Sequence, residues 1–198
     1  DQGVLRTSSE GVNLLMFLDQ LPQLEDVDGI VAHGLELHGF DETAEVSGSV
    51  RISGLYLRLI DVKPGYSFPS GEIQFAGKRG ELSGLVGGPE KGDGRAEISG
   101  HIQLDPIAGV SYSLSVEGED IPYNFDDVFD VSRIDVDLTL TGTAAGARIS
   151  GRSLLEGANI DLPLIDLNAP PVPPPPPAVQ DPFLQGMELD LQVDIRDL

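Results

Sequence analysis

Residues 131–163 contain the pattern that most constrains how this chain folds. Aliphatic and polar residues alternate strictly from Ile134 to Thr141, and the alternation ends at Gly142. Successive side chains of an extended strand point to opposite faces, so this segment predicts a strand with one aliphatic face and one solvated face. Glycines follow at each expected strand end, where they permit a turn or a bulge.

The same arrangement occurs earlier in the chain, so the sequence contains an internal repeat. Segment 35–57 matches segment 138–160 in the spacing of its aliphatic residues and glycines. The intervals between repeats are irregular, which predicts a loose array of β-strands and not a fixed-period solenoid. An aliphatic residue followed by Ser-Gly recurs at Val46, Ile52, Leu82, Ile98 and Ile149.

These features predict an all-β fold, an elongated antiparallel sheet that curls into a groove with an apolar concave lining. The hydrophobic content of 40% suffices for a core, and the 24 glycines lie mainly where strands should end. Short connections favour antiparallel neighbours in a meander, with segment 120–130 as one connection. The alternation changes phase at Gly54-Leu55, which requires a bulge or a tight corner.

We expect one domain over residues 1–169, a polyproline linker at 170–178 and a final strand within 179–198 that completes or extends the sheet. The proline run would form a rod of roughly 25 Å at about 3.1 Å per residue, long enough to cross a sheet without pairing. The alternation is cut at Leu198 and the chain opens at Asp1, so we expect a piece of a longer protein. Its final strand would then be an edge that can pair with another molecule, including a second copy of this chain.

Residues 12–21 are the one candidate helix. Their leucines and Phe17 form a broad apolar face, Ser8 and Ser9 precede it as caps, and Pro22 follows its end. A buried strand is also compatible with this run. As a helix, it would pack on or cap the end of the sheet; a helix on a membrane surface is the alternative, which the lack of flanking Lys or Arg disfavours.

The charge excludes several classes of partner. With 33 acidic and 12 basic residues the net charge is -21, so nucleic acid and anionic membrane surfaces would be repelled. The chain has no cysteine, which excludes disulfides and thiol chemistry. It also has no apolar run of about 18 residues that could span a bilayer.

No residue pattern predicts an enzyme, a cofactor or a metal site. His33 and His38 are five apart on an expected strand, so they should point to opposite faces and not chelate together. The acidic pairs near positions 26, 126 and 135 complete no calcium loop. Segment 87–92 lacks the Gly-Lys-Ser/Thr of a phosphate-binding loop, and no nucleophile elbow occurs.

The aliphatic faces are the remaining feature to explain. A sheet with one apolar face must cover it with a second sheet, a helix, a partner or a ligand, and an ordinary sandwich core is one such solution. If the sheet curls, its lining offers alkyl chains a surface without polar anchors. The predicted lining consists of Leu35, Leu37, Val50, Ile52, Ile98, Ile102, Leu104, Leu114, Val116, Ile134, Val136, Leu138 and Leu140.

Two segments resemble the C-terminal domain of the TamB family of translocation and assembly module proteins. One is the strand 134–142 with Arg-Ile-Ser-Gly at 148–151 and Leu-Glu-Gly-Ala-Asn-Ile-Asp-Leu-Pro at 155–163, and the other is 18–54. Family members commonly have proline just before the turn, where this chain has Ala147-Arg148 in one segment and Glu45 in the other. The motifs are short, so the resemblance depends on their order and spacing.

This resemblance implies a periplasmic module of an inner-membrane-anchored, AsmA-like protein of a double-membraned bacterium, with the anchor outside this chain. It implies a curled sheet that shields and conducts phospholipid acyl chains between the inner and outer membranes, with an outer-membrane barrel of the TamA or BamA type as partner. Assembly of barrel proteins by strand augmentation is an alternative, as is a purely structural β-module. The resemblance implies no catalytic residues.

Overall fold

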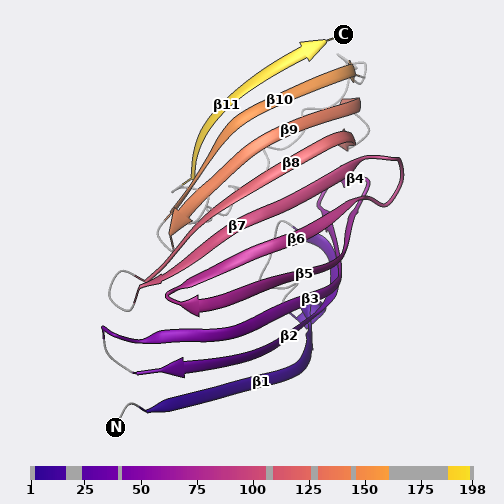
Figure 1. Cartoon of the computed structure of the whole chain (residues 1–198). Coiled ribbons are helices and arrows are strands. Elements are labelled where there is room, and N and C mark those ends of the chain that lie inside the picture. Colours follow the sequence, from indigo (N-terminus) through magenta and orange to yellow (C-terminus); the bar gives the residue numbers. More distant parts are fainter. Residues whose placement is uncertain are drawn as a thin grey trace, which may run out of the picture.

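The computed structural model forms one open sheet, and it describes residues 3–16, 24–39, 42–105, 109–125, 129–143, 146–160 and 187–196. The all-β prediction is confirmed (Figure 1). The strands are β1 (Val4–Asn13), β2 (Leu24–His38), β3 (Glu45–Leu59), β4 (Val62–Lys63), β5 (Tyr66–Gly77), β6 (Arg79–Pro89), β7 (Arg95–Asp105), β8 (Gly109–Phe125), β9 (Phe129–Thr143), β10 (Gly146–Ile160) and β11 (Met187–Arg196).

The strands follow one another across the sheet in the order β1-β2-β3-β5-β6-β7-β8-β9-β10-β11. The short strand β4 lies outside this order and pairs with β8. Neighbours from β1 to β10 pair antiparallel, as the short connections predict. β1 and β11 form the two edges, which lie at opposite ends of the sheet (Figure 1).

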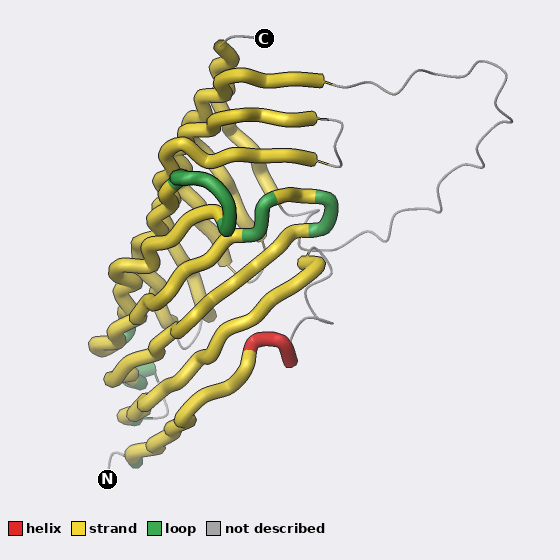
Figure 2. Tube along the Cα trace, turned by 90° about the vertical axis from the view of Figure 1, so that its right-hand side faces the viewer, coloured by secondary structure: helices red, strands yellow, loops and turns green. Residues whose placement is uncertain are grey.

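The sheet is curled because its long strands bend (Figure 2). Irregularities interrupt the pairing between Asp28 and Ile30 in β2, between Leu82 and Leu85 in β6, and between Gly118 and Ile121 in β8. Bulges increase the local twist and bend a strand. Gly54 in β3 has a φ of 60°, a conformation that favours glycine, so the corner predicted at Gly54-Leu55 is confirmed.

The short strand β4 joins distant parts of the sheet. Val62 and Lys63 pair with Phe125 and Asn124 at the end of β8, although β4 leads directly into β5. Next to it, the Glu90 N–H donates to the Gly65 carbonyl at 2.7 Å. β4 therefore bridges the ends of β5, β6 and β7 and links β3 to β8.

The best-buried side chains lie near this bridge and the bends. Val131 is 1% exposed, Phe68 4% and Leu85 5%, and Val62 and Ile121 are buried as well. Phe68, Leu82 and Leu85 form a cluster that side chains from β3, β5, β7 and β8 surround. The core is thus the inside of the curl, and no polar residue is buried in the part of the chain that is described.

Two local predictions are wrong. Val12 and Asn13 end β1 instead of beginning a helix, because they pair with Val31 and Ile30 of β2. A single 3-10 turn follows at 14–16. Residues 17–21 of the predicted helix lie outside the described residues. The expected connection at 120–130 is largely strand, since β8 continues to Phe125 and β9 begins at Phe129. A bulge at Asp120, with a φ of 54°, lets the strand continue.

The prediction that all neighbouring strands pair antiparallel is also wrong for the last pair, β10 and β11. β11 runs parallel to β10, with Ala147 opposite Met187 and Glu156 opposite Arg196. A parallel neighbour requires the chain to travel back along the strand before it re-enters the sheet. The intervening residues 161–186, which include the predicted polyproline linker at 170–178, lie outside the described part.

Truncation of Phe68 should show how strongly the inner cluster stabilises the fold. We expect Phe68→Ala to lower the free energy of unfolding by about 3–5 kcal/mol, because it removes a buried ring and leaves a cavity. Val193→Ala, at a position that is 51% exposed, should change it by less than about 0.5 kcal/mol. Urea denaturation followed by circular dichroism measures both, and equal effects would contradict this account of the core.

The Tyr66 phenol predicts a loss of stability in alkali. Its O–H donates to the Pro122 carbonyl at 3.4 Å, and burial, with Tyr123 nearby, raises its pKa. The stabilisation is therefore complete below the unfolded value of about 10 and is lost as the pH rises through the folded pKa. Between about pH 8 and about pH 11, Tyr66→Phe should lose less stability in urea denaturation than the wild type. Parallel losses would contradict this assignment.

Candidate functional site

The thirteen side chains of the predicted lining lie on one face of the sheet, which we call the apolar face. Residues directly opposite each other in neighbouring strands share a face. Ile98 is opposite Val116, and Val116 is opposite Leu138. The other predicted residues follow by alternation along their own strands and by similar pairs, such as Leu114 with Leu140. The apolar face therefore runs without interruption from β2 to β9.

All thirteen residues are partly buried. None belongs to the sealed core, and none is among the widely exposed large side chains. Such intermediate exposure fits a lining that neighbouring side chains support from the sides while one surface stays open. No second sheet covers this face in the described ranges, since their strands all belong to one sheet.

The register adds apolar-face residues that were not predicted. Ile73 and Leu82 are opposite each other and continue the row from Val50 to Leu114, and Ile149 and Leu189 extend that row to β11. Alternation in 72–75 and 187–195 was the signal for them, but single strands do not show which neighbours they join. On β11, Leu189, Leu191, Val193 and Ile195 are between 43% and 65% exposed.

Aromatic rings cover two of the glycines on this face. A Cβ atom at Gly80 would lie 2.6 Å from a ring carbon of Phe75 on the neighbouring strand. At Gly142 it would lie 2.5 Å from the hydroxyl of Tyr112. The rings therefore lie across the glycine positions and fill the space that a side chain there would need.

An apolar notch opens where the apolar face meets the hairpin turns. Its volume is about 240 Å³, and Leu37 and Leu104 from the predicted lining both contribute to its wall. Val46 and Val110, which were not predicted, contribute as well. We use "the notch" for the space lined by Leu37, Ala44, Val46, Gly77, Leu104, Asp105, Gly109 and Val110.

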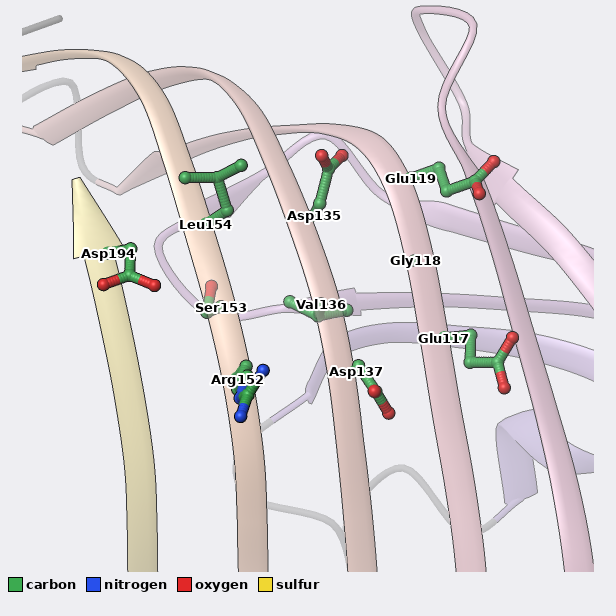
Figure 3. Close-up of a pocket in the computed structure, with 10 residues that line it drawn as sticks. All are labelled: Glu117, Gly118, Glu119, Asp135, Val136, Asp137, Arg152, Ser153, Leu154 and Asp194. Carbon is green, nitrogen blue, oxygen red and sulfur yellow. The ribbon is translucent and has the colours of Figure 1, made fainter. Parts of the chain in front are cut away.

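A larger hollow of about 540 Å³ lies over β8 to β11 and is strongly acidic. Glu117, Asp137 and Arg152 come from three neighbouring strands, and Asp135 and Asp194 lie near them (Figure 3). Within the described residues, no group of three or more histidine, cysteine or acidic side chains is arranged to hold a metal ion. The hollow therefore has the character of a solvated polar surface.

The histidines lie as the strand alternation predicts. His33 is opposite Val50 on the apolar face, whereas His38 is opposite Glu45 on the polar face. His38 Nε2 lies 3.4 Å from Glu36 Oε2. The two rings cannot bind one metal ion together.

In the described part of the chain, no helix has the length and apolar character needed to cross a membrane.

Comparisons with known proteins identify no relative. The chain matches no protein-family model, no curated protein and no solved structure. The resemblance to the TamB family therefore stays a prediction from residues and spacing. Any functional assignment depends on the geometry and chemistry of the apolar face.

Proposed function

We propose that this sheet binds the alkyl chains of lipids on its apolar face and shields them from water. The observation that carries the proposal is the continuity of partly exposed aliphatic side chains on one face, from Leu35 in β2 to Leu140 in β9. Apolar surfaces of this extent on soluble proteins usually mark binding sites. An elongated face fits an elongated ligand.

The energetics favour a ligand made of methylene groups. Exposure of a chain of about 16 carbons to water costs on the order of 12 kcal/mol, at roughly 0.8 kcal/mol for each methylene. Contact with the apolar face removes much of this cost. Because the face offers mainly aliphatic groups with no directional polar anchor, a bound chain can move along it across small barriers.

The polar face suits an aqueous setting. Ion pairs such as Arg95 with Glu97 and Arg148 with Asp190 cross its exposed surface, and the net charge of -21 keeps it hydrated. Together with the resemblance to the TamB family, this supports a periplasmic segment that conducts phospholipid between the inner and outer membranes. An outer-membrane barrel of the TamA or BamA type would be its partner.

A second candidate function is a scaffold for barrel assembly. The edge strand β11 pairs with β10 on one side only, and its aliphatic side chains are exposed. An extended peptide could add to such an edge by backbone hydrogen bonds. This function predicts peptide binding at β11, whereas lipid shielding predicts ligand contact in the middle of the apolar face.

Introduction of a negative charge on the apolar face should strongly reduce lipid loading. We expect Leu138→Asp, and likewise Ile102→Asp, to reduce copurifying lipid by about tenfold or more, because a carboxylate in the path of an alkyl chain must be desolvated. Thr139→Asp is the matched control, since Thr139 neighbours Leu138 but is exposed on the polar face. Lipid is measured by organic extraction and mass spectrometry after detergent-free purification.

The outcomes separate the candidate functions. Phospholipid in the wild type and in Thr139→Asp, but not in a folded Leu138→Asp protein, supports lipid shielding. Equal lipid content in all three proteins, each with the circular dichroism of a folded sheet, would refute it. Wild-type protein without lipid that binds extended peptides would favour the scaffold.

A further inference from the structure

The last strand, β11, differs from the other strands in how it joins the sheet. It pairs parallel with β10 and with no other strand in the described ranges, whereas the neighbours from β1 to β10 are antiparallel. Residues 161–186 separate the two strands in the sequence, so no tight turn joins them. Figure 1 shows β11 as the outermost strand at the C-terminal end of the sheet. The ladder with β10 is therefore its one backbone attachment to the sheet.

The core would stay closed if β11 left this ladder. Of the ten residues of β11, only Met187 is even partly buried. β10 is held from its other side, where the buried residues Ala147 and Ala158 lie opposite Gly142 and Val131 of β9. Parallel ladders are also slightly less stable for each residue than antiparallel ones. β11 can therefore detach while β10 keeps its place in the sheet.

The ladder between β10 and β11 is nevertheless specific in its register. It runs from Ala147 opposite Met187 to Glu156 opposite Arg196 without a bulge. Leu189 lies opposite Ile149, so the aliphatic residues of β11 continue the apolar face. A slip of one residue would move them to the polar face. The edge of β10 thus selects a strand with aliphatic residues at alternate positions.

Charges on the polar face select the strand further and fix its direction. Arg148 and Arg152 of β10 supply two of only 12 basic residues in a chain with a net charge of -21. A guanidinium nitrogen of Arg148 lies 2.6 Å from a carboxylate oxygen of Asp190, and at the other end Arg196 lies 3.6 Å from Glu156. A reversed strand would bring like charges together at both ends, which is destabilising.

We propose that the edge of β10 is a binding site for an extended strand of another protein, and that β11 occupies this site until such a strand displaces it. The occupant in the structure defines the class of partner. Its strand has aliphatic residues at alternate positions, carboxylates at the end that meets Arg148 and a basic residue at the end that meets Glu156. In strand addition, backbone bonds supply affinity and alternate side chains supply specificity.

This site is distinct from the functions proposed above. It does not depend on lipid shielding. It also differs from peptide addition at the outer edge of β11, because the incoming strand takes the place of β11 and pairs with β10.

The covalent connection makes β11 a strong competitor for the site. Two segments of one chain meet at an effective concentration on the order of mM. A free strand of the same sequence at about 10 μM would therefore fill only about 1% of the sites. A partner gains the site when the pairing of β11 is weakened or when other contacts hold the partner nearby. β11 thus keeps the edge of β10 covered in the absence of a partner.

Displacement is tested with a fluorescein-labelled peptide that has the sequence of residues 186–197, added to the full chain and followed by fluorescence anisotropy. A Gln192→Pro/Val193→Pro chain weakens β11, since adjacent residues direct their N–H groups to opposite sides and one of the two must face β10. We expect this variant to bind the peptide at least tenfold more tightly than the wild type, because the competing strand is lost.

A disulfide supplies the matched control. Leu154 and Asp194 lie opposite each other on the polar face, and the chain has no cysteine of its own. Oxidation of a Leu154→Cys/Asp194→Cys chain therefore joins β11 to β10. The oxidised protein should bind no peptide, and reduction should restore the wild-type affinity.

A second variant replaces the proline variant if the latter lacks the circular dichroism spectrum of a folded sheet. Glu188→Lys/Asp190→Lys weakens β11 by placing positive charge near Arg148, and it should bind the peptide at least twofold more tightly than the wild type in low-salt buffer. A peptide with Asp190→Lys should bind the weakened chain about twofold to fivefold less tightly than the wild-type peptide, as expected for an exposed ion pair. Equal binding of the two peptides would overturn the acidic specificity.

The remaining outcomes decide the site itself. If the oxidised protein binds the peptide as tightly as the folded proline variant, the peptide occupies another edge and the site on β10 is overturned. If no folded variant binds the peptide, the edge of β10 accepts no strand in trans and the inference fails. Copurifying lipid is measured separately in the same proteins, so a failure of lipid shielding and a failure of the strand site are distinguishable.

Discussion

The register of the backbone ladder is the constraint on which the rest of this structure depends. A slip of one residue in any strand pair would move the aliphatic side chains of that strand to the polar face. Over the straight parts of the strands the pairing is regular, as between Ile98 and Val116. At the bends the register shifts at bulges, such as the one between Gly118 and Ile121. Beyond this bulge, aliphatic residues such as Ile121 and Ile134 again face inwards.

This constraint explains why the apolar face could be predicted and why its surroundings could not. Each lining residue was identified from alternation within its own strand, and alternation survives pairing with any neighbour. The notch depends on hairpin lengths, so the contribution of Val46 and Val110 to its wall became visible only once the position of the β5–β6 turn at Lys78 was known. The pairing of Val62 with Phe125 joins segments far apart in the chain and leaves no periodic signal in either.

The errors have the same physical origin. Residues 12–21 carry a helical apolar face, yet at the start of this segment the pairing of Val12 with Val31 in the sheet overrides the local preference. The segment before Phe129 has many acidic residues, but Ile121 and Tyr123 align with Ile134 and Val131 across β9 and keep it in the sheet. The parallel entry of β11 could not be anticipated, because strand alternation carries no information on chain direction.

The bridge made by β4 has a mechanical consequence. Because Val62 and Lys63 are covalently continuous with β3 and β5 and hydrogen-bonded to β8, the strands from β3 to β8 form a closed loop of covalent and hydrogen bonds. Bending modes that would separate β3 from β8 must break that loop, whereas β1 and β11 move without such a penalty. At this end of the strands the distance between β3 and β8 is therefore held by the β4 bridge, a link that β1 and β11 do not have among the described residues.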